Sequence, residues 1–165
     1  MSFHVKRKDK EITDSGTLKM VLKATKYVTL ALSKDNEPYL VSLSHGYDEG
    51  RNCIYFHCAS VGKKLDYLRS NNLVWGQALL DYGYAEGKCD HLYASVHFRG
   101  KVAFIDDLGE KRAAIGCMMK QVDRKPEVLM AGLDMERLKG TTICRIDIEG
   151  MSGKKSTQID TTRCG

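Results

Sequence analysis

The chain has 165 residues, of which 42% are hydrophobic and 28% are charged, and its net charge is +5. This length suits one domain with a substantial core, and the composition is that of a soluble globular protein. No apolar run is long enough to cross a membrane, and the N-terminus lacks the apolar region of a secretory signal, so we expect a cytoplasmic protein without membrane contacts.

The positive charge is concentrated at the two ends of the chain. Residues 1–26 sum to +4 and residues 151–165 to +2, which leaves −1 for the middle. This distribution argues against a nucleic-acid-binding face on the folded body. We expect one domain over residues 1–150 that begins with a basic arm at 1–12, followed by a polar tail at 151–165. Solvated chain ends explain the charge most simply, and weak, salt-sensitive contacts by the ends are the alternative.

The cysteines show no spacing typical of a metal site. They are Cys53, Cys58, Cys89, Cys117, Cys144 and Cys164. None forms a CxxC pair, and the scatter indicates buried thiols in a reducing compartment rather than a disulfide framework. Cys89 and His91 are the only close Cys/His pair, which supplies too few ligands, so we predict no metal site.

The first part of the chain predicts a helix followed by hairpin-connected strands. Asp14 or Ser15 can cap a helix from Gly16 to Thr25. The short turns between the next segments are typical of antiparallel hairpins. Strands are predicted at Tyr27 to Ser33, Tyr39 to Tyr47 and Asn52 to His57. In the second of these strands, Ser42 and Ser44 alternate with Val41 and Leu43 and are expected on the opposite face.

The junction after the third strand favours an anion. Small residues from Cys58 to Gly62 precede Lys63 and Lys64, which open a helix ending near Asn71. The first turn of a helix has unpaired N–H groups and a partial positive charge, and the two lysines add to it. A phosphate is therefore the expected ligand, and an ordinary turn with two solvated lysines is the alternative. The segment is not a P-loop, because no GxxxxGK[ST] motif precedes it.

The second part predicts long strands around another helix. Strands are expected at Leu73 to Tyr84, His91 to Ile105 and Thr141 to Ile148, a helix at Leu108 to Val122 and a short helix or irregular cover at 123–140. Asp106 or Asp107 can cap the helix, and Gly100 suits a bend or bulge in its strand. The total of about six strands, without a GxGxxG motif, predicts a mainly β fold: a six-stranded antiparallel barrel with flanking helices.

The segment from Pro38 to Leu68 resembles a known family. Its strand PYLVSLSHGY, the following hairpin and the run IYFHCASVGKKLDYL are similar to split-barrel flavoproteins related to pyridoxamine 5′-phosphate oxidase. The similarity is strongest to the branch that includes nitroimidazole-resistance proteins. The helix segment EKRAA and the closing strand also fall where this family has them, so the resemblance covers about residues 8–150.

The resemblance implies a six-stranded split β-barrel that forms a homodimer, with FMN at the dimer interface. Carried over by position, the implied FMN contacts are Gly62, Lys63 and Lys64 at the phosphate; Val41, Ser42, Leu43 and Ser44 beside the isoalloxazine ring; His57, Cys58 and Ala59 along the ribityl chain and ring; and Ser95 and Val96 completing the groove. Residue 42 is often proline in this branch. The serine here would change the hydrogen bonding of the ring.

The implied function is that of an FMN-dependent oxidoreductase acting on a small organic acceptor, such as a nitroaromatic or quinone-like compound. The flavin supplies the chemistry, and no catalytic side chain is assigned. A vitamin B6 substrate is also considered, but oxidation of pyridoxamine phosphate is disfavoured, because only Arg163 follows Arg145 in the C-terminal segment. The alternatives are a non-catalytic protein that binds FMN, haem or a deazaflavin, and a regulatory domain whose basic arm binds a partner. His57 is either a ring-side residue or a backbone-bonded histidine, and Cys58 suits packing better than nucleophilic attack.

Overall fold

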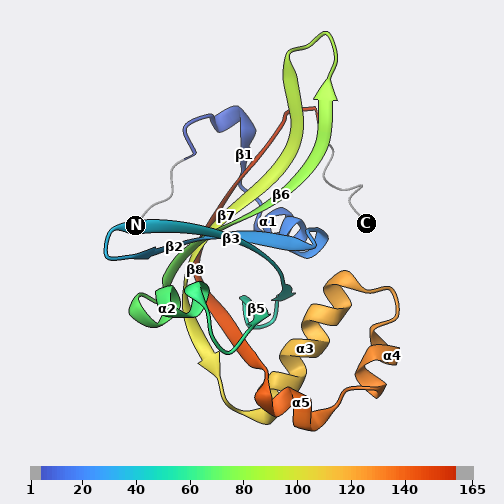
Figure 1. Cartoon of the computed structure of the whole chain (residues 1–165). Helices are drawn as coiled ribbons and strands as arrows, with labels where there is room; N and C mark the ends of the chain where they lie inside the picture. Colours follow the sequence, from blue (N-terminus) through green and yellow to red (C-terminus); the bar gives the residue numbers. More distant parts are fainter. Residues whose placement is uncertain (1–4, 159–165) are drawn as a thin grey trace.

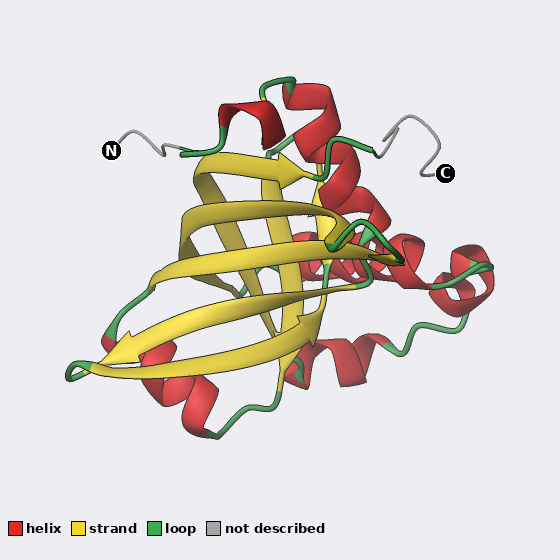
Figure 2. Cartoon of the chain, turned by 90° about the horizontal axis from the view of Figure 1, so that it is seen from above, coloured by secondary structure: helices red, strands yellow, loops and turns green. Residues whose placement is uncertain are grey.

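The computed structural model describes residues 5–158, and within them an antiparallel sheet rolls into a barrel (Figures 1 and 2). The sheet is eight-stranded, with the order β3-β2-β6-β7-β8-β5-β4, and β1 pairs with β8 off this path. The strands are β1 Glu11–Ile12, β2 Tyr27–Lys34, β3 Glu37–Ser44, β4 Gly46–Asp48, β5 Cys53–Cys58, β6 Leu73–Ala85, β7 Asp90–Ile105 and β8 Thr142–Lys155. The predicted mainly β barrel is confirmed, with two short strands more than expected.

Helices lie outside the barrel. They are the 3-10 helix η1 Lys8–Lys10 and the α-helices α1 Ser15–Ala24, α2 Lys63–Ser70, α3 Leu108–Val122, α4 Pro126–Ala131 and α5 Met135–Gly140. Asp14 caps α1 by accepting a hydrogen bond from the N–H of Thr17, and Asp107 caps α3 in the same way through Glu110. Figure 1 shows α3, α4 and α5 together beside one end of the barrel and α2 apart from them. Within residues 5–158, no helix is long and apolar enough to cross a bilayer.

The barrel interior holds the main hydrophobic core. Leu30, Phe56, Phe98 and Ile146 are buried there and come from four different strands. A second, smaller cluster lies between the barrel and α3. The predicted irregularity in β7 is confirmed, because the pairing of β7 with β8 shifts register between Arg99 and Gly100.

The strand predicted over Tyr39 to Tyr47 is in fact two strands. β3 pairs with β2 at one end of the strand order, and β4 pairs with β5 at the other end. His45 lies between them and is fully buried. The direction of the chain therefore changes at His45, a change that the alternation of side chains does not show.

Both ends of the predicted domain also differ from expectation. β8 extends to Lys155, because its second half pairs with β7 and with β1. Residues 151–155 thus belong to the barrel and not to a polar tail. On the N-terminal side, Val5 is buried and Glu11–Ile12 form β1, so part of the predicted basic arm packs on the barrel. Arg163 and Cys164 lie outside the described residues.

Candidate functional site

The wall of the barrel is open beside β3, the strand that comes directly before β4 in the chain. β4 pairs with β5 from Asp48 and Cys53 as far as Gly46 and Tyr55. Beyond this point β3 pairs only with β2, whereas β5 continues to Cys58. One edge of β3 and the end of β5 are therefore not joined by strand pairing. We call the region between them the split.

The start of α2 forms one boundary of the split. Its N-cap is Gly62, which has a φ of 135° and no side chain to cap the helix. The carbonyl of Gly62 accepts hydrogen bonds from the N–H groups of Leu65 and Asp66. The N–H groups of Lys63 and Lys64 precede any intrahelical acceptor and lie at the positive end of the helix dipole. This end of α2 therefore has the unpaired N–H groups and the positive dipole end on which the predicted anion site depends.

The side chain of Lys63 reaches across the split to β3. Its Nζ atom lies 3.2 Å from Oε1 of Glu37, 4.9 Å from the ring centroid of Tyr39 and 5.4 Å from that of Tyr67. The two tyrosine rings pack with their centroids 5.2 Å apart. Hydrogen bonding to Tyr67, and then to Lys63, lowers the pKa of Glu37. Because this ion pair is exposed, it holds Lys63 only weakly.

Cys58 lies on the inner side of the split, at the end of β5. It is half-buried and packs against the barrel core. A hydrogen bond with the thiol of Cys144 on β8 lowers the pKa of Cys58, and the charges of Lys64 and Arg69 act in the same direction against the effect of burial.

His57 and Ala59 are exposed beside Cys58. His57 lies at the end of β5 and also lines a cavity of about 350 Å³, whose other walls come from α3, α4, α5 and the connections on either side of α5. His57 is thus common to the split and to this cavity. Cys58, by contrast, is not among the residues that line it.

The β3 wall of the split has two faces, as predicted. Val41 is half-buried and Leu43 is buried, and both belong to the barrel core. Ser42 and Ser44 are exposed on the outer face. The hydroxyl of Ser42 is 2.9 Å from that of Thr29 on β2. Because β3 pairs with one neighbour only, every second residue directs its backbone N–H and C=O away from β2.

The structure places Ser95 and Val96 away from the split. Both lie on β7, which is separated from β3 by β2 and β6. Val96 is fully buried in the core and pairs with Ala78 on one side and Gly153 on the other. Within a single chain these two residues do not complete the groove that the resemblance implies, because a central strand has no free edge.

Sequence reasoning missed three residues at the split. Glu37 and Tyr39 lie at the start of β3, and Tyr67 lies on α2. The position of Tyr67 four residues after Lys63 is a local signal, since residues at this spacing are neighbours on a helix. The approach of Lys63 to Glu37 depends on where α2 packs, and no local pattern indicates it.

A family model described as pyridoxamine 5′-phosphate oxidase matches residues 14–155. The chain belongs to this family. The match ends at the residue where β8 ends, which agrees with a domain that extends beyond residue 150. The search of curated proteins found no match to this sequence.

Solved structures share the split-barrel fold. A putative 5-nitroimidazole antibiotic resistance protein from Bacteroides thetaiotaomicron is 22% identical, with a TM-score of 0.77, and the match covers 87% of this chain and 85% of that one. For the flavocytochrome Anf3 from Azotobacter vinelandii the identity is 20%, the TM-score 0.78 and the coverage 95% and 75%. For a FAD-binding protein from Mesorhizobium loti the values are 23%, 0.63, 87% and 95%. At these identities the comparison shows the fold.

Proposed function

We propose that this protein binds FMN in the split and acts as an oxidoreductase on a small organic acceptor. The observation that carries the proposal is the uncapped start of α2, with Gly62, Lys63 and Lys64, beside the unpaired edge of β3. These two features offer a phosphate site and a set of backbone hydrogen-bonding groups in one region.

The phosphate would lie at the start of α2. An anion can come close to the backbone N–H groups there, because Gly62 has no side chain. The space around its Cα is also open, since no atom lies within 4 Å of the position that a Cβ would take. Lys63 and Lys64 supply charge. Lys63 would exchange its exposed contact with Glu37 for the phosphate, which carries the greater negative charge.

The ring would lie against β3. The pyrimidine part of a flavin has several hydrogen-bond donors and acceptors. The backbone at Val41 and Leu43 would bind them, because these residues belong to β3, the strand whose second edge is unpaired. Ser42 and Ser44 add hydroxyl groups on the exposed face. The chain's part in this arrangement is to bind and orient, and the bound flavin would supply the electron transfer.

The names of the similar structures agree with a flavin. One is named a FAD-binding protein and one a flavocytochrome. The name of a third refers to resistance against 5-nitroimidazoles, which motivates a nitroaromatic acceptor. Names of proteins that share the fold support this proposal without deciding between acceptors.

We also propose that two copies form a homodimer. The outer face of β2, β3 and β6 exposes Tyr27, Leu40 and Leu79, and an apolar sheet face of this kind is commonly covered by a partner. Ser42 and Ser44 of β3 lie on the same face, so a second copy would approach the proposed ring site.

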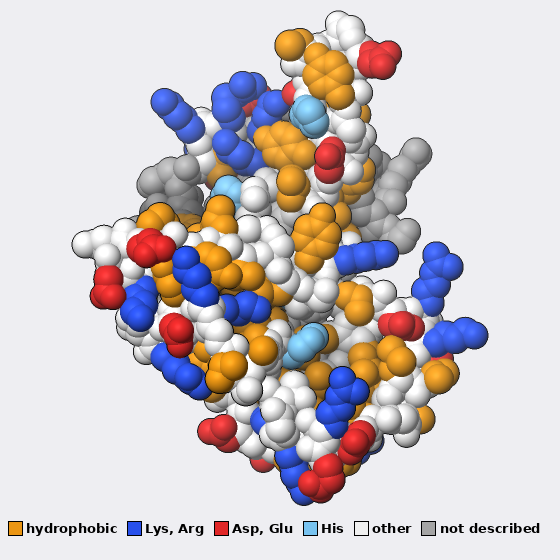
Figure 3. Space-filling model, viewed as in Figure 1, with side chains coloured by type: hydrophobic (Ala, Val, Ile, Leu, Met, Phe, Trp, Pro, Cys, Tyr) orange, Lys and Arg blue, Asp and Glu red, His pale blue; other side chains and the backbone are white. Residues whose placement is uncertain are grey.

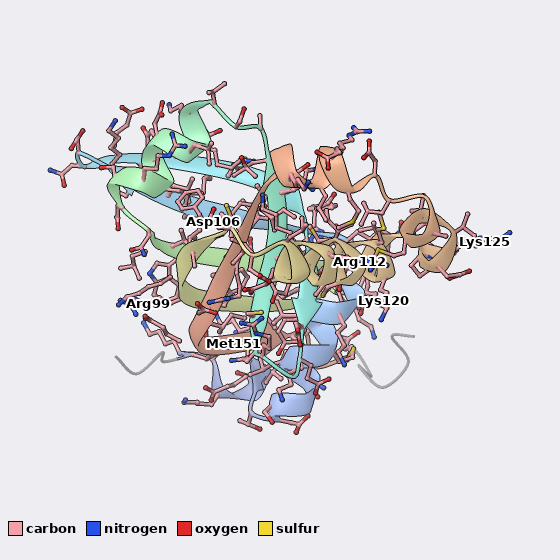
Figure 4. All side chains as sticks on the ribbon, turned by 90° about the horizontal axis from the view of Figure 1, so that it is seen from below. Arg99, Asp106, Arg112, Lys120, Lys125 and Met151 are labelled. Carbon is pink, nitrogen blue, oxygen red and sulfur yellow. The ribbon has the colours of Figure 1, made fainter. Side chains whose placement is uncertain are left out.

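The visible spectrum of the purified protein, followed by titration with FMN, tests the proposal. We expect flavin absorbance bands and about one FMN per chain. Lys63→Glu and Lys64→Glu should each weaken FMN binding by at least about tenfold, or ~1.4 kcal/mol. The matched charge reversal Lys120→Glu, on the exposed side of α3, should leave the affinity unchanged (Figure 4).

Glu37→Gln serves as a second variant, because it removes the competing carboxylate and leaves both lysines. FMN affinity should be equal to or higher than that of the wild type. A colourless protein that takes up no FMN would overturn the proposal. A Soret band in place of flavin bands would show that the protein binds haem and not FMN.

A further inference from the structure

The cavity lined by His57 lies between the end of β5 and the helices α3, α4 and α5. It is lined by α3, by α4, by α5 and the connections on either side of it, and by the end of β5. Its volume of about 350 Å³ lies within the range of small-molecule sites. Figure 1 shows that α3, α4 and α5 form a separate group of helices, so this cavity is built mostly from one insertion between β7 and β8.

The walls of the cavity are mainly apolar. Ile115 and Met119 lie one turn apart on α3 and face it. Leu133 and Leu138 approach from the other side, and Leu138 is almost completely buried. Figure 3 shows hydrophobic atoms on the surface of the α3–α5 region as well. Walls of this kind favour an apolar ring, and methionine adapts its shape to one.

One cation in the lining is available to a ligand. Arg137, on α5, lines the cavity and forms no ion pair with any residue in the described part of the chain. The carboxylate that also lines it, Asp134, accepts hydrogen bonds from the N–H groups of Glu136 and Arg137 at 2.9 and 3.3 Å. Asp134 is thus engaged in capping α5. A guanidinium group suits a planar anion such as a carboxylate, because it donates two parallel hydrogen bonds.

His57 lines the cavity and lies at the end of β5, next to Cys58 at the split, and its side chain is exposed. We propose that this cavity holds the acceptor and that the acceptor is a planar aromatic molecule with a carboxylate, whose ring packs on the apolar walls and whose carboxylate binds Arg137. This inference rests on the proposed function, because it takes the flavin to lie in the split. It adds the class of substrate and the residue that selects it.

The test compares two probes of similar shape. We would measure the binding of 4-nitrobenzoate and of nitrobenzene by calorimetry and by the change in flavin absorbance. The wild-type protein should bind 4-nitrobenzoate at least about tenfold more tightly, a difference of ~1.4 kcal/mol. Arg137→Gln should remove this preference while FMN affinity stays at the wild-type value.

Two further variants define the location. Arg112→Gln changes an arginine on α3 that faces away from this cavity, and it should retain the preference (Figure 4). Leu133→Trp fills the cavity and should weaken both probes. Thermal unfolding of each variant would show that it is folded.

The outcomes separate this inference from the proposed function. If the protein binds FMN but neither probe, or binds both probes equally, the inference is overturned and the flavin site stands. If Arg137→Gln discriminates as well as the wild type, the inference is also overturned. If the protein takes up no FMN but calorimetry shows a preference for 4-nitrobenzoate that depends on Arg137, the anion site stands and the proposed function falls.

Discussion

At the scale of single residues, the buried imidazole of His45 makes stability depend on pH. Its Nε2 atom lies 3.1 Å from the carbonyl of Leu22, and its Nδ1 atom is buried without a hydrogen-bond partner in the described residues. Burial lowers the pKa of His45. The folded protein therefore keeps the imidazole neutral at pH values where the unfolded chain takes up a proton. The contribution of the neutral His45 to the stability is fully present above the unfolded pKa of about 6.5. It is lost progressively as the pH falls below this value toward the lower pKa of the folded state.

His45→Gln should flatten this dependence. We expect wild-type protein to be less stable at about pH 5 than at about pH 7.5, in the range where most carboxylates are still ionised. Urea unfolding at the two pH values measures the difference. The variant should lose stability at the higher pH but show a smaller change between the two, whereas His91→Gln, at an exposed position, should behave like the wild type. An unchanged slope for His45→Gln would show that other groups cause the pH dependence.

Some residues of the candidate site can be predicted from local sequence, and others only from the packing of distant segments. The start of α2 is a local feature, so small residues before Lys63 and Lys64 were enough to predict an anion site. The contact between Lys63 and Glu37 joins residues 26 positions apart and depends on the packing of α2. Val96 was assigned by family position, and its place in a central strand depends on the pairing of β7 on both sides.

At the scale of elements, the close contact of β4 with α3 depends on a glycine. A Cβ atom at Gly46 would lie 2.5 Å from the backbone nitrogen of Met118 and 2.6 Å from the backbone carbon of Cys117. Gly46→Ala must therefore push α3 away from the barrel, which should cost about 1–3 kcal/mol of unfolding free energy. Gly140→Ala is the matched control, because nothing lies within 4 Å of its Cβ position.

Urea unfolding would measure both glycine variants. Gly140→Ala should be neutral or stabilising by up to about 1 kcal/mol, since alanine restricts the unfolded chain. Equal stability of the two variants would mean that α3 moves without cost and that the β4 contact does not fix its position.

Elements with local signals were predicted well from the sequence. α1 and α3 have acidic N-caps, and the hairpins have short polar turns. The sequence does not indicate the short strand β1, the division of β4 from β3 or the second half of β8. Their residues become strands because a partner lies beside them: Gly153 packs against Leu18 and Ile12, while Lys154 pairs with Glu11 and with Ser95. Such long-range pairing gives no periodic pattern in a segment of two or three residues.

At the scale of the whole molecule, one sheet face remains to be covered. Strand register places Leu40, Ala31 and Trp75 in one row across β3, β2 and β6, and the rows of Ser42 and Ser44 follow. Tyr27, Leu40 and Leu79 on this face are 64%, 67% and 50% exposed. Side chains of this size at such exposure favour association, and a second copy of the same face gives a closed two-fold dimer.

Introducing charge on this face should separate the two copies. We expect the wild-type protein to sediment as a dimer and Leu40→Glu combined with Leu79→Glu to sediment as a monomer. The reason is that a two-fold interface places each new carboxylate in the buried contact of both copies. Val128→Glu, which changes an equally exposed apolar residue on α4, should remain dimeric. Because the face includes Ser42 and Ser44, the monomeric variant should also bind FMN at least about tenfold more weakly. A wild-type protein that stays monomeric at high concentration would rule out the dimer, and a monomeric variant with full FMN affinity would show that one chain completes the site alone.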